Sequence, residues 1–166
     1  MICCKYVSDK YRHRNHQSQY ELYCYDIARH RRRHIHTHML YGIDDGASDC
    51  DMSLTLMGMD YEQGVRGIFC TNHSYGMDDY YRDYHRRFDK LRKLVEERYP
   101  GLSLYKGCEV LCCQDEMPEI IANIRNGVYP TLNGTDHVLL EFDPHGTNGM
   151  EEIRYCLEYA LDKGYV

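Results

Sequence analysis

The spacing of apolar residues alternates between two patterns along most of this chain. Short apolar runs rich in β-branched residues are typical of buried strands, and they precede longer stretches in which apolar residues recur every three or four positions, as on one helix face. The predicted strands span residues 34–40, 65–71, 102–110 and 137–142. The predicted helices span residues 48–63, 78–99, 115–125 and 149–163. Tyr165 and Val166 look like the first residues of a fifth strand.

The helical patterns also predict which side chains face the core. The expected inner faces are Met52, Leu56 and Met59 in the first helix, Tyr81, Tyr84, Phe88, Leu91 and Val95 in the second, and Met117, Ile120, Ile121 and Ile124 in the third. Gly64 and Gly164 follow helices as C-terminal caps, and Pro100 stops the second helix. These stops leave only short links between each helix and the next strand.

Strict alternation of strand and helix predicts an α/β fold in which parallel strands are joined by right-handed crossovers. A doubly wound sheet and a barrel both satisfy this order. A (β/α) barrel typically needs about 250 residues, whereas this chain has 166. We therefore expect, if it is a barrel, a partial one of about four βα units. Its open edge favours self-association.

The composition fits one globular domain, because hydrophobic residues make up 43% of the chain and charged residues 28%. No apolar run approaches the ~18 residues of a membrane span, and residues 1–15 lack the apolar stretch of a signal peptide. The expectation is a cytoplasmic protein without membrane insertion. Its nine Cys are then reduced thiols.

Charge divides the chain into two parts near residue 33. Residues 1–33 contain eight basic and three acidic residues, so their net charge is +5, and the remainder carries −11 of the total of −6. Residues 1–33 also lack helical or strand periodicity, so we expect a disordered basic extension ahead of a domain at 34–166. There are two alternatives for residues 1–33. They form a basic arm that binds RNA or an acidic partner, or they are not native coding sequence. The acidic domain argues against nucleic acid as its own partner.

Chemistry-bearing side chains stand near the carboxyl end of each predicted strand. The set comprises His36, His38, Asp45, His73, Glu109 and Glu141. His36 and His38 lie two apart and share one face of a strand, so together they can hold a divalent metal. Glu109 and Glu141 interrupt otherwise apolar strands, where a buried carboxylate needs a cation or a partner. Taken singly, His73 could be an ordinary loop histidine and Glu141 a paired surface carboxylate. As a set, these residues predict a metal site at the strand ends.

Four segments in order carry a resemblance to a known family: HIHTHMLYGIDDGASD, TNH, GCEV and PTLNGTDHVLLEF. They resemble the PHP (polymerase and histidinol phosphatase) superfamily, and more closely the manganese-dependent tyrosine-protein phosphatases of capsule and exopolysaccharide operons, of the CpsB/CapC/YwqE type. The resemblance covers roughly residues 35–166. It implies a distorted, TIM-like barrel with a cluster of up to three Mn²⁺ ions, with Zn²⁺ or Fe²⁺ as alternatives.

The resemblance also implies a role for each residue of the set. His36, His38 and Glu109 would hold one metal, Glu109 would bridge to a second that Glu141 also binds, and Asp45 and His73 would hold a third. Two departures matter. His34 stands where the family usually has an acidic residue, and the family's further ligands and phosphate-binding Arg residues have no counterpart here. The expectation is therefore a truncated chain of low activity alone.

The function implied is that of a phosphotyrosine-protein phosphatase whose substrate is a bacterial tyrosine kinase that controls polysaccharide assembly. A metal-bound water, not a protein nucleophile, would attack the phosphorus. The cysteines agree, because no Cys is followed six positions later by the Arg of a C-x₅-R phosphatase loop. The alternatives are a non-catalytic metal- or partner-binding remnant and a nucleic-acid binder that uses the basic arm.

Overall fold

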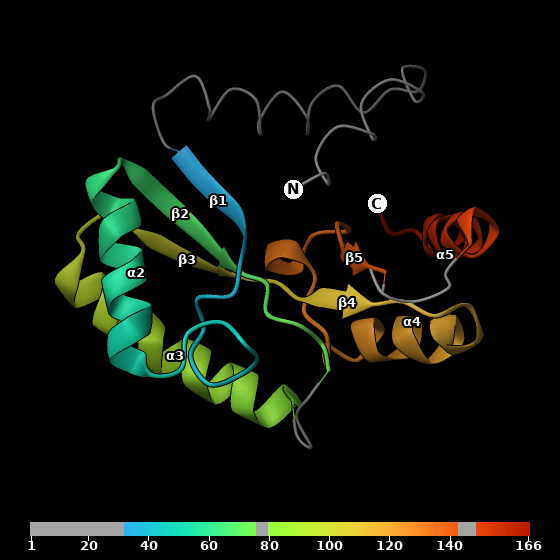
Figure 1. The fold of residues 1–166 in the computed structure, drawn as a ribbon, viewed down its shortest axis with the longest axis horizontal. Coiled ribbons are helices and arrows are strands. Elements are labelled where there is room, and N and C mark those ends of the chain that lie inside the picture. Colours follow the sequence, from blue (N-terminus) through green and yellow to red (C-terminus); the bar gives the residue numbers. More distant parts are fainter. Residues whose placement is uncertain (1–31, 76–79, 143–148) are drawn as a thin grey trace. The chain divides into compact units, whose positions relative to one another are not determined.

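The computed structural model describes residues 32–75, 80–142 and 149–166 (Figure 1). The predicted disordered extension falls outside these residues, except for Arg32 and Arg33, which begin the first strand two residues earlier than expected. The described elements are β1 (Arg32–Thr37), α2 (Cys50–Glu62), β2 (Val65–Cys70), α3 (Tyr80–Arg98), β3 (Ser103–Lys106), β4 (Glu109–Leu111), the 3₁₀ turn η1 (Gln114–Glu116), α4 (Met117–Arg125), the 3₁₀ turn η2 (Leu132–Gly134), β5 (Leu139–Glu141) and α5 (Met150–Asp162).

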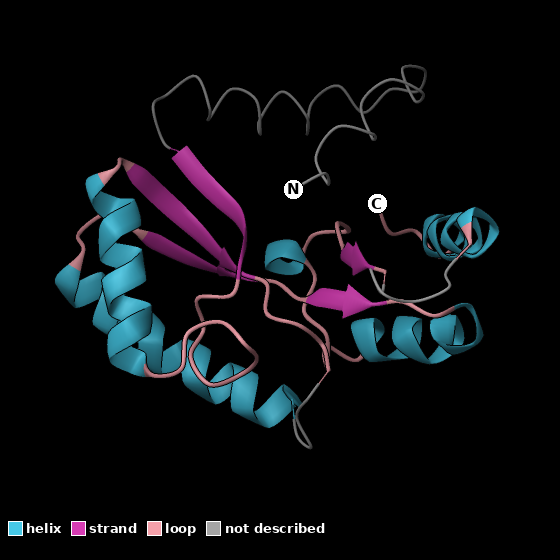
Figure 2. Cartoon of the chain, viewed as in Figure 1, coloured by secondary structure: helices cyan, strands magenta, loops and turns pink. Residues whose placement is uncertain are grey.

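The strands form two parallel sheets, in the orders β1-β2-β3 and β4-β5. A single parallel bridge between His73 and Glu109 connects the end of β2 to the start of β4. Helices α2 and α3 contact β2 and β3, while α4 and α5 contact one another beside the second sheet (Figure 2). The predicted α/β class with parallel strands is therefore confirmed. Closure into a barrel is not established by these pairings.

The third predicted strand, 102–110, is wrong as one continuous element. It is broken at Gly107 and Cys108 into β3 and β4, which belong to different sheets. A Cβ at Gly107 would lie 2.8 Å from the Thr71 side chain, so only glycine fits. The Gly107 N–H donates to the hydroxyl of Tyr84 at 3.1 Å, and that hydroxyl donates to the Cys70 carbonyl at 2.7 Å. The buried tyrosine thus satisfies backbone groups where the chain changes sheets.

The inner face predicted for α2 is also wrong. Met52 and Met59 are 42% and 54% exposed, whereas Leu54 and Met57 are buried. Apolar residues surround this helix, so their spacing does not select a face. Packing selects it: the Tyr99 hydroxyl donates to the Leu54 carbonyl at 2.8 Å, and a Cβ on the neighbouring Gly58 would meet that hydroxyl at 2.6 Å.

The two strongly amphipathic helices follow their predicted faces. On α3 and α4 the expected residues within the described side chains are all buried: Tyr84, Phe88, Leu91, Val95, Met117, Ile120, Ile121 and Ile124. The side chain of Tyr81 lies outside the described part. Near the C-terminus, Tyr165 and Val166 do not form a strand, although Val166 donates to the Asp136 carbonyl and accepts from the Val138 N–H, both at 2.9 Å.

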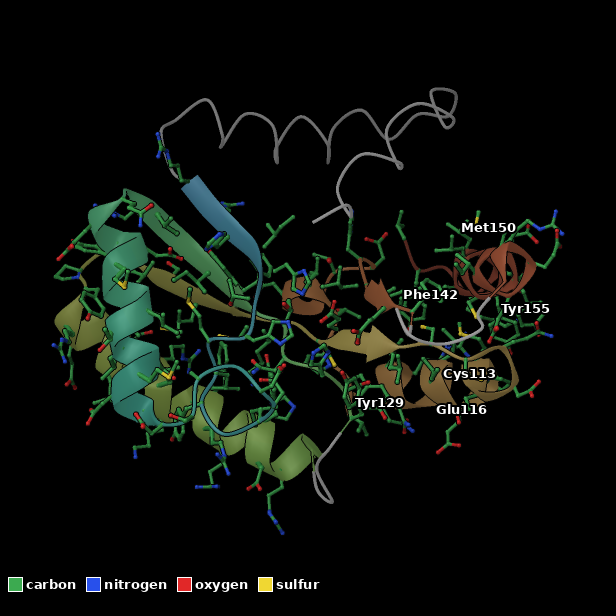
Figure 3. The ribbon with its side chains drawn as sticks, viewed as in Figure 1. Cys113, Glu116, Tyr129, Phe142, Met150 and Tyr155 are labelled. Atoms are coloured by element: carbon green, nitrogen blue, oxygen red, sulfur yellow. The ribbon has the colours of Figure 1, made fainter. Side chains whose placement is uncertain are left out.

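Helix α5 differs from α3 and α4 in its surface. Met150 and Tyr155 project from it and are exposed (Figure 3). Cys156 and Ala160 form its buried side. None of the helices in the described ranges is both long enough and apolar enough to cross a membrane.

Candidate metal centre

Five of the six predicted ligands meet near the strand ends, and the sixth, Asp45, lies at their border beside His73. His36 lies in β1 and His38 directly follows it, and His73 stands three residues beyond β2. Glu109 begins β4 and Glu141 ends β5. Within each sheet the parallel strands place their carboxyl ends on one side, and the bridge between His73 and Glu109 places the start of β4 beside the end of β2. The side chains thus lie close together, but Glu109 stands at the amino end of its strand and not at the carboxyl end that the sequence analysis expected.

The orientation of the two strand histidines follows from Thr37 between them. Thr37 is buried, and its hydroxyl donates to the Phe69 carbonyl at 2.7 Å. Its backbone N–H donates to the Thr71 hydroxyl at 3.0 Å. Since successive strand residues point to opposite faces, anchoring Thr37 toward the core directs His36 and His38 to the other face.

The first group of donor atoms has the spacing of a coordination shell. His36 Nε2 lies 3.2 Å from His38 Nε2 and 3.2 Å from Glu109 Oε1. His38 Nε2 lies 3.2 Å from Glu109 Oε2. A metal with bonds of about 2.1 Å separates neighbouring ligand atoms by about 3.0 Å in octahedral and about 3.4 Å in tetrahedral geometry. The three side chains therefore fit one divalent ion.

The second group consists of His73, Glu109 and Glu141. His73 Nδ1 lies 3.1 Å from Glu109 Oε2 and 2.9 Å from Glu141 Oε2. Within the described ranges, however, neither His73 Nδ1 nor Glu141 Oε2 has a partner in hydrogen-bonding geometry, although both atoms are buried. Buried polar atoms that converge without bonding each other are the donors that a shared metal ion satisfies. The chemistry of this group thus also fits a metal.

Asp44 and Asp45 differ sharply in burial, although they are adjacent in sequence. The Asp45 side chain is 87% exposed, and its Oδ1 lies 3.8 Å from His73 Nε2. The Asp44 side chain is only 4% exposed. It accepts hydrogen bonds from His38 Nδ1 at 2.8 Å, Asn72 Nδ2 at 2.8 Å and the backbone N–H of His73 at 2.9 Å. Asp44 therefore orients His38 and ties the two loops together.

Asp44 and Asn72 are the residues that the sequence analysis missed. The run Asp44-Asp45 and the Asn in TNH were visible signals, but nothing in them distinguishes a ligand from the residue that orients it. His34, at the position where a family acid is expected, pairs with Asp60 of α2 at 2.7 Å. The histidine that stands in place of the family's acidic residue therefore pairs with a carboxylate on the neighbouring helix.

The histidines and carboxylates of the cluster shift one another's pKa values. Hydrogen bonds with Asp44 and Glu109 raise the pKa of His38 to about 10. Burial pushes the pKa of Glu109 upward, but hydrogen bonds with His36 and His38 outweigh burial and lower it to about 2. Burial and the nearby charge of Glu109 raise the pKa of Glu141. Crowded carboxylates need positive charge beside them, and a divalent cation supplies it in exchange for protons.

Comparison with known proteins adds the family. Residues 33–166 match the family described as "Capsular polysaccharide synthesis, CpsB/CapC". The tyrosine-protein phosphatase CpsB of Streptococcus agalactiae serotype V is 32% identical over 110 residues, which are 65% of this chain and 44% of that protein. The protein of the same name from Streptococcus pneumoniae is 29% identical over 113 residues, 67% of this chain and 45% of the relative. The chain thus spans less than half the length of these curated relatives.

A solved structure has the same arrangement of elements. It comes from work on YwqE from Bacillus subtilis and CpsB from Streptococcus pneumoniae, described as metal-dependent tyrosine phosphatases. The TM-score is 0.68 at 25% identity, over 81% of this chain and 53% of the other. The family match begins within β1 and runs to Val166, so it includes every predicted ligand. This chain therefore belongs to the CpsB/CapC family of capsular polysaccharide synthesis.

Proposed function

We propose that this chain carries metal-binding residues of a PHP-type, metal-dependent phosphotyrosine-protein phosphatase that acts in capsule or exopolysaccharide synthesis. The observation that carries the proposal is the pair of donor groups, His36/His38/Glu109 and His73/Glu109/Glu141, whose atoms lie 2.9–3.2 Å apart. The relatives' names supply the reaction. For the fold of this phosphatase we propose an arc of a distorted barrel. The parallel strands, which follow one another in sequence order, and the bridge between the two sheets support this proposal.

The donors are imidazole nitrogens and carboxylate oxygens without a thiolate, a set that suits Mn²⁺, Zn²⁺ or Fe²⁺. The resemblance to manganese-dependent phosphatases favours Mn²⁺ among them. His36, His38 and Glu109 would hold a first ion. Glu109, which faces both His38 and His73, would also contribute to a second position together with Glu141. Asp45 and His73 would hold a third, with Asp45 as the exposed and adjustable ligand.

Hydrolysis joins water oxygen to phosphorus while the bond from phosphorus to the tyrosine oxygen breaks, and the products are inorganic phosphate and the free phenol. Bound metal ions would acidify the attacking water and neutralise charge on the phosphoryl oxygens. Glu109 holds His36 and His38 in register, and Asp44 fixes the His38 tautomer so that Nε2 faces the site.

The buried cysteines do not compete for the role of nucleophile. Burial raises the pKa of Cys70 and of Cys112 to about 12, so both stay as unreactive thiols at neutral pH. This is consistent with attack by water.

The proposed protein substrate is a phosphotyrosine-bearing bacterial tyrosine kinase. Self-association of the chain through a sheet edge stays a prediction.

Calorimetry with Mn²⁺ on the full chain tests the metal site. His36→Ala and Glu109→Ala are expected to weaken binding strongly, because each removes a donor from the first group. His137→Ala is the matched control, since His137 is partly exposed and pairs with Asp136 at 2.8 Å. Unchanged binding in both ligand variants, or equal losses in the control, would contradict the site.

Hydrolysis of p-nitrophenyl phosphate and of a phosphotyrosine peptide tests the reaction. In the described part of the chain, the ion pairs of the cluster join imidazoles to carboxylates, and no Lys or Arg takes part in them. Positioning cations for the phosphoryl group would add to the rate. We expect slow turnover by the 166-residue chain and faster turnover by a version extended to the relatives' length. His38→Ala should abolish that gain. Metal binding without turnover in the extended version would favour the second candidate, a non-catalytic metal-binding protein.

A further inference from the structure

One aromatic side chain borders the cluster without belonging to its donors. Tyr75 follows His73 by two residues and stacks on its imidazole, with ring centroids 4.7 Å apart and planes inclined by 28°. The His38 ring lies against the same imidazole in an edge-to-face contact at 4.5 Å. Tyr75 is nevertheless 47% exposed, so the contact with His73 covers only part of its ring.

The uncovered part of Tyr75 faces a cavity beside the candidate metal centre. The cavity has a volume of about 420 Å³ and is lined by Ile43, Asp44, Asp45, His73 and Tyr75. This volume lies within the range of about 300–1,000 Å³ that is usual for small-molecule sites. Its walls are of two kinds: donors that belong to the metal centre, and the apolar surface of Ile43 and Tyr75.

These two kinds of wall match the two ends of an aryl phosphate. A phosphate dianion is repelled by the carboxylates of Asp44, Asp45 and Glu109 unless divalent cations lie between them. An aromatic ring attached to that phosphate needs an apolar or aromatic surface a few ångströms away. Stacked and edge-to-face aromatic pairs are favoured at centroid separations of about 4.5–7 Å. Tyr75 offers such a surface at the border of the cluster.

We infer that Tyr75 is a specificity-determining residue, whose ring packs against the aromatic ring of an aryl phosphate held by the metal centre. This inference rests on the proposed phosphatase function and adds to it a preference for aryl phosphates over alkyl phosphates. An alkyl phosphate has no ring to place against Tyr75. It therefore gains only the contacts of its phosphoryl group.

Direct binding to the Mn²⁺-loaded full chain tests the inference, with phenyl phosphate and ethyl phosphate as probes. The Tyr75→Ala variant is expected to bind phenyl phosphate about 5- to 10-fold more weakly, in line with the usual strength of an aromatic pair. Its affinity for ethyl phosphate should stay within about two-fold of that of the unaltered chain. The Tyr75→Phe variant keeps the ring and should retain the preference for the aryl probe.

Two controls separate recognition from a purely structural role of the tyrosine. Mn²⁺ affinity, measured in the same variants, should be unchanged, because Tyr75 is not a donor. Tyr155→Ala removes a tyrosine of similar exposure that contacts Tyr159 on α5, far along the chain from the cluster (Figure 3). It should alter neither probe.

The outcomes distinguish this inference from the function on which it rests. Equal losses for both probes in Tyr75→Ala, or a lowered Mn²⁺ affinity, would mean that Tyr75 only holds His73 in place and would overturn the inference alone. An unchanged preference for phenyl phosphate would overturn it as well. Failure of the Mn²⁺-loaded, unaltered chain to bind either phosphate would overturn the proposed function together with the inference.

Discussion

Strand β2 with helix α3 in the first sheet region and strand β5 with helix α5 in the second differ in how deeply they are buried. In the first, every residue of β2 except Arg66 is buried, and α3 places a continuous apolar face against the sheet. In the second, all three residues of β5 are only partly buried, and α5 leaves Met150, Leu157 and Leu161 exposed. The candidate metal centre draws on both parts. His36 comes from β1, whose residues are mostly exposed, His73 follows the buried β2, and Glu141 ends the partly buried β5.

This contrast suggests a division of labour within the centre. Glu109 lies at the junction and faces His36, His38 and His73, whereas Glu141 contacts only His73 among the cluster's histidines in the described part of the chain. Precise donor placement requires side chains locked by packing. We therefore expect Glu109, whose side chain is only 10% exposed, to be the preformed carboxylate, and the more exposed Glu141 to adjust to its ion.

The largest expected effect is on stability and tests the difference in packing. Leu91→Ala removes a fully buried side chain from α3 and should destabilise the fold by about 2–5 kcal/mol. Leu161→Ala on α5 removes a side chain that is 48% exposed and should cost less than about 1 kcal/mol. Urea denaturation measures both values. Similar losses in the two variants would show that the second region is as tightly packed as the first.

The next effect concerns the two carboxylates that bridge the regions. Glu109→Gln removes the partner of three histidines and should weaken Mn²⁺ binding by at least about 100-fold, since even losing a residue that merely supports a ligand costs about 10–100-fold. Glu141→Gln should cost about 10-fold. Calorimetric titration measures both. A larger loss for Glu141→Gln than for Glu109→Gln would reverse the proposed division.

A smaller effect separates the adjacent aspartates within the well-packed region. Asp44→Asn keeps the shape but loses the charge that orients His38, and should weaken Mn²⁺ binding by about 10-fold. Asp45→Asn alters an exposed side chain and should cost about three-fold or less. The ratio of the two affinities is the measurement. If Asp45→Asn had the larger effect, the exposed aspartate would be the principal ligand of this loop.

The smallest effect is a pH dependence of stability outside the centre. Burial, followed by the charge of Lys106, lowers the pKa of His85, while Asp89 and the Gly127 carbonyl favour its protonation. The unfolded chain, with a His pKa near 6.5, therefore takes up this proton before the folded chain does. Stability contributed by neutral His85 is present above that pH and is lost as the pH falls through 6.5 and below.

His85→Gln tests this dependence, because glutamine does not titrate. Unfolding free energies of the variant should decline less between pH 7.5 and pH 5.5 than those of the unaltered chain. The Lys106 ammonium lies 2.8 Å from His85 Nδ1, so Lys106→Met should reduce the decline in the same direction. Parallel pH profiles of all three proteins would exclude His85 as the source.

Much of the fold follows from local patterns. The faces of α3 and α4 were predictable because their apolar residues form one stripe, and burying that stripe outweighs other terms. The convergence of His36, His73 and Glu141 was predictable because carboxyl ends of parallel strands meet at one edge. These features depend only on residue order and on the two periods of regular structure.

Other features were decided by tertiary structure alone. The sequence of α2 offers apolar residues on several sides, and packing of Leu54 and Met57 into the common core decides which side is buried. The sequence predicts one strand at 102–110, but the structure has two, because β3 pairs with β2 while β4 pairs with β5. Between them, the hydroxyl of the buried Tyr84 accepts a hydrogen bond from the Gly107 N–H.

The loop that follows β1 gives the clearest case. Asp44 and Asp45 are the same residue type at neighbouring positions, so no local pattern assigns one to the interior. The loop closes through backbone hydrogen bonds from Gly42 N–H to the Ala47 carbonyl at 2.7 Å and from Ala47 N–H to the His38 carbonyl at 3.0 Å. That closure turns Asp44 toward His38 and Asn72 and leaves Asp45 in solvent. The sequence by itself determined that acidic oxygens stand beside the strand histidines, whereas the path of the backbone through long-range contacts decided which carboxylate orients a histidine and which stays exposed to solvent.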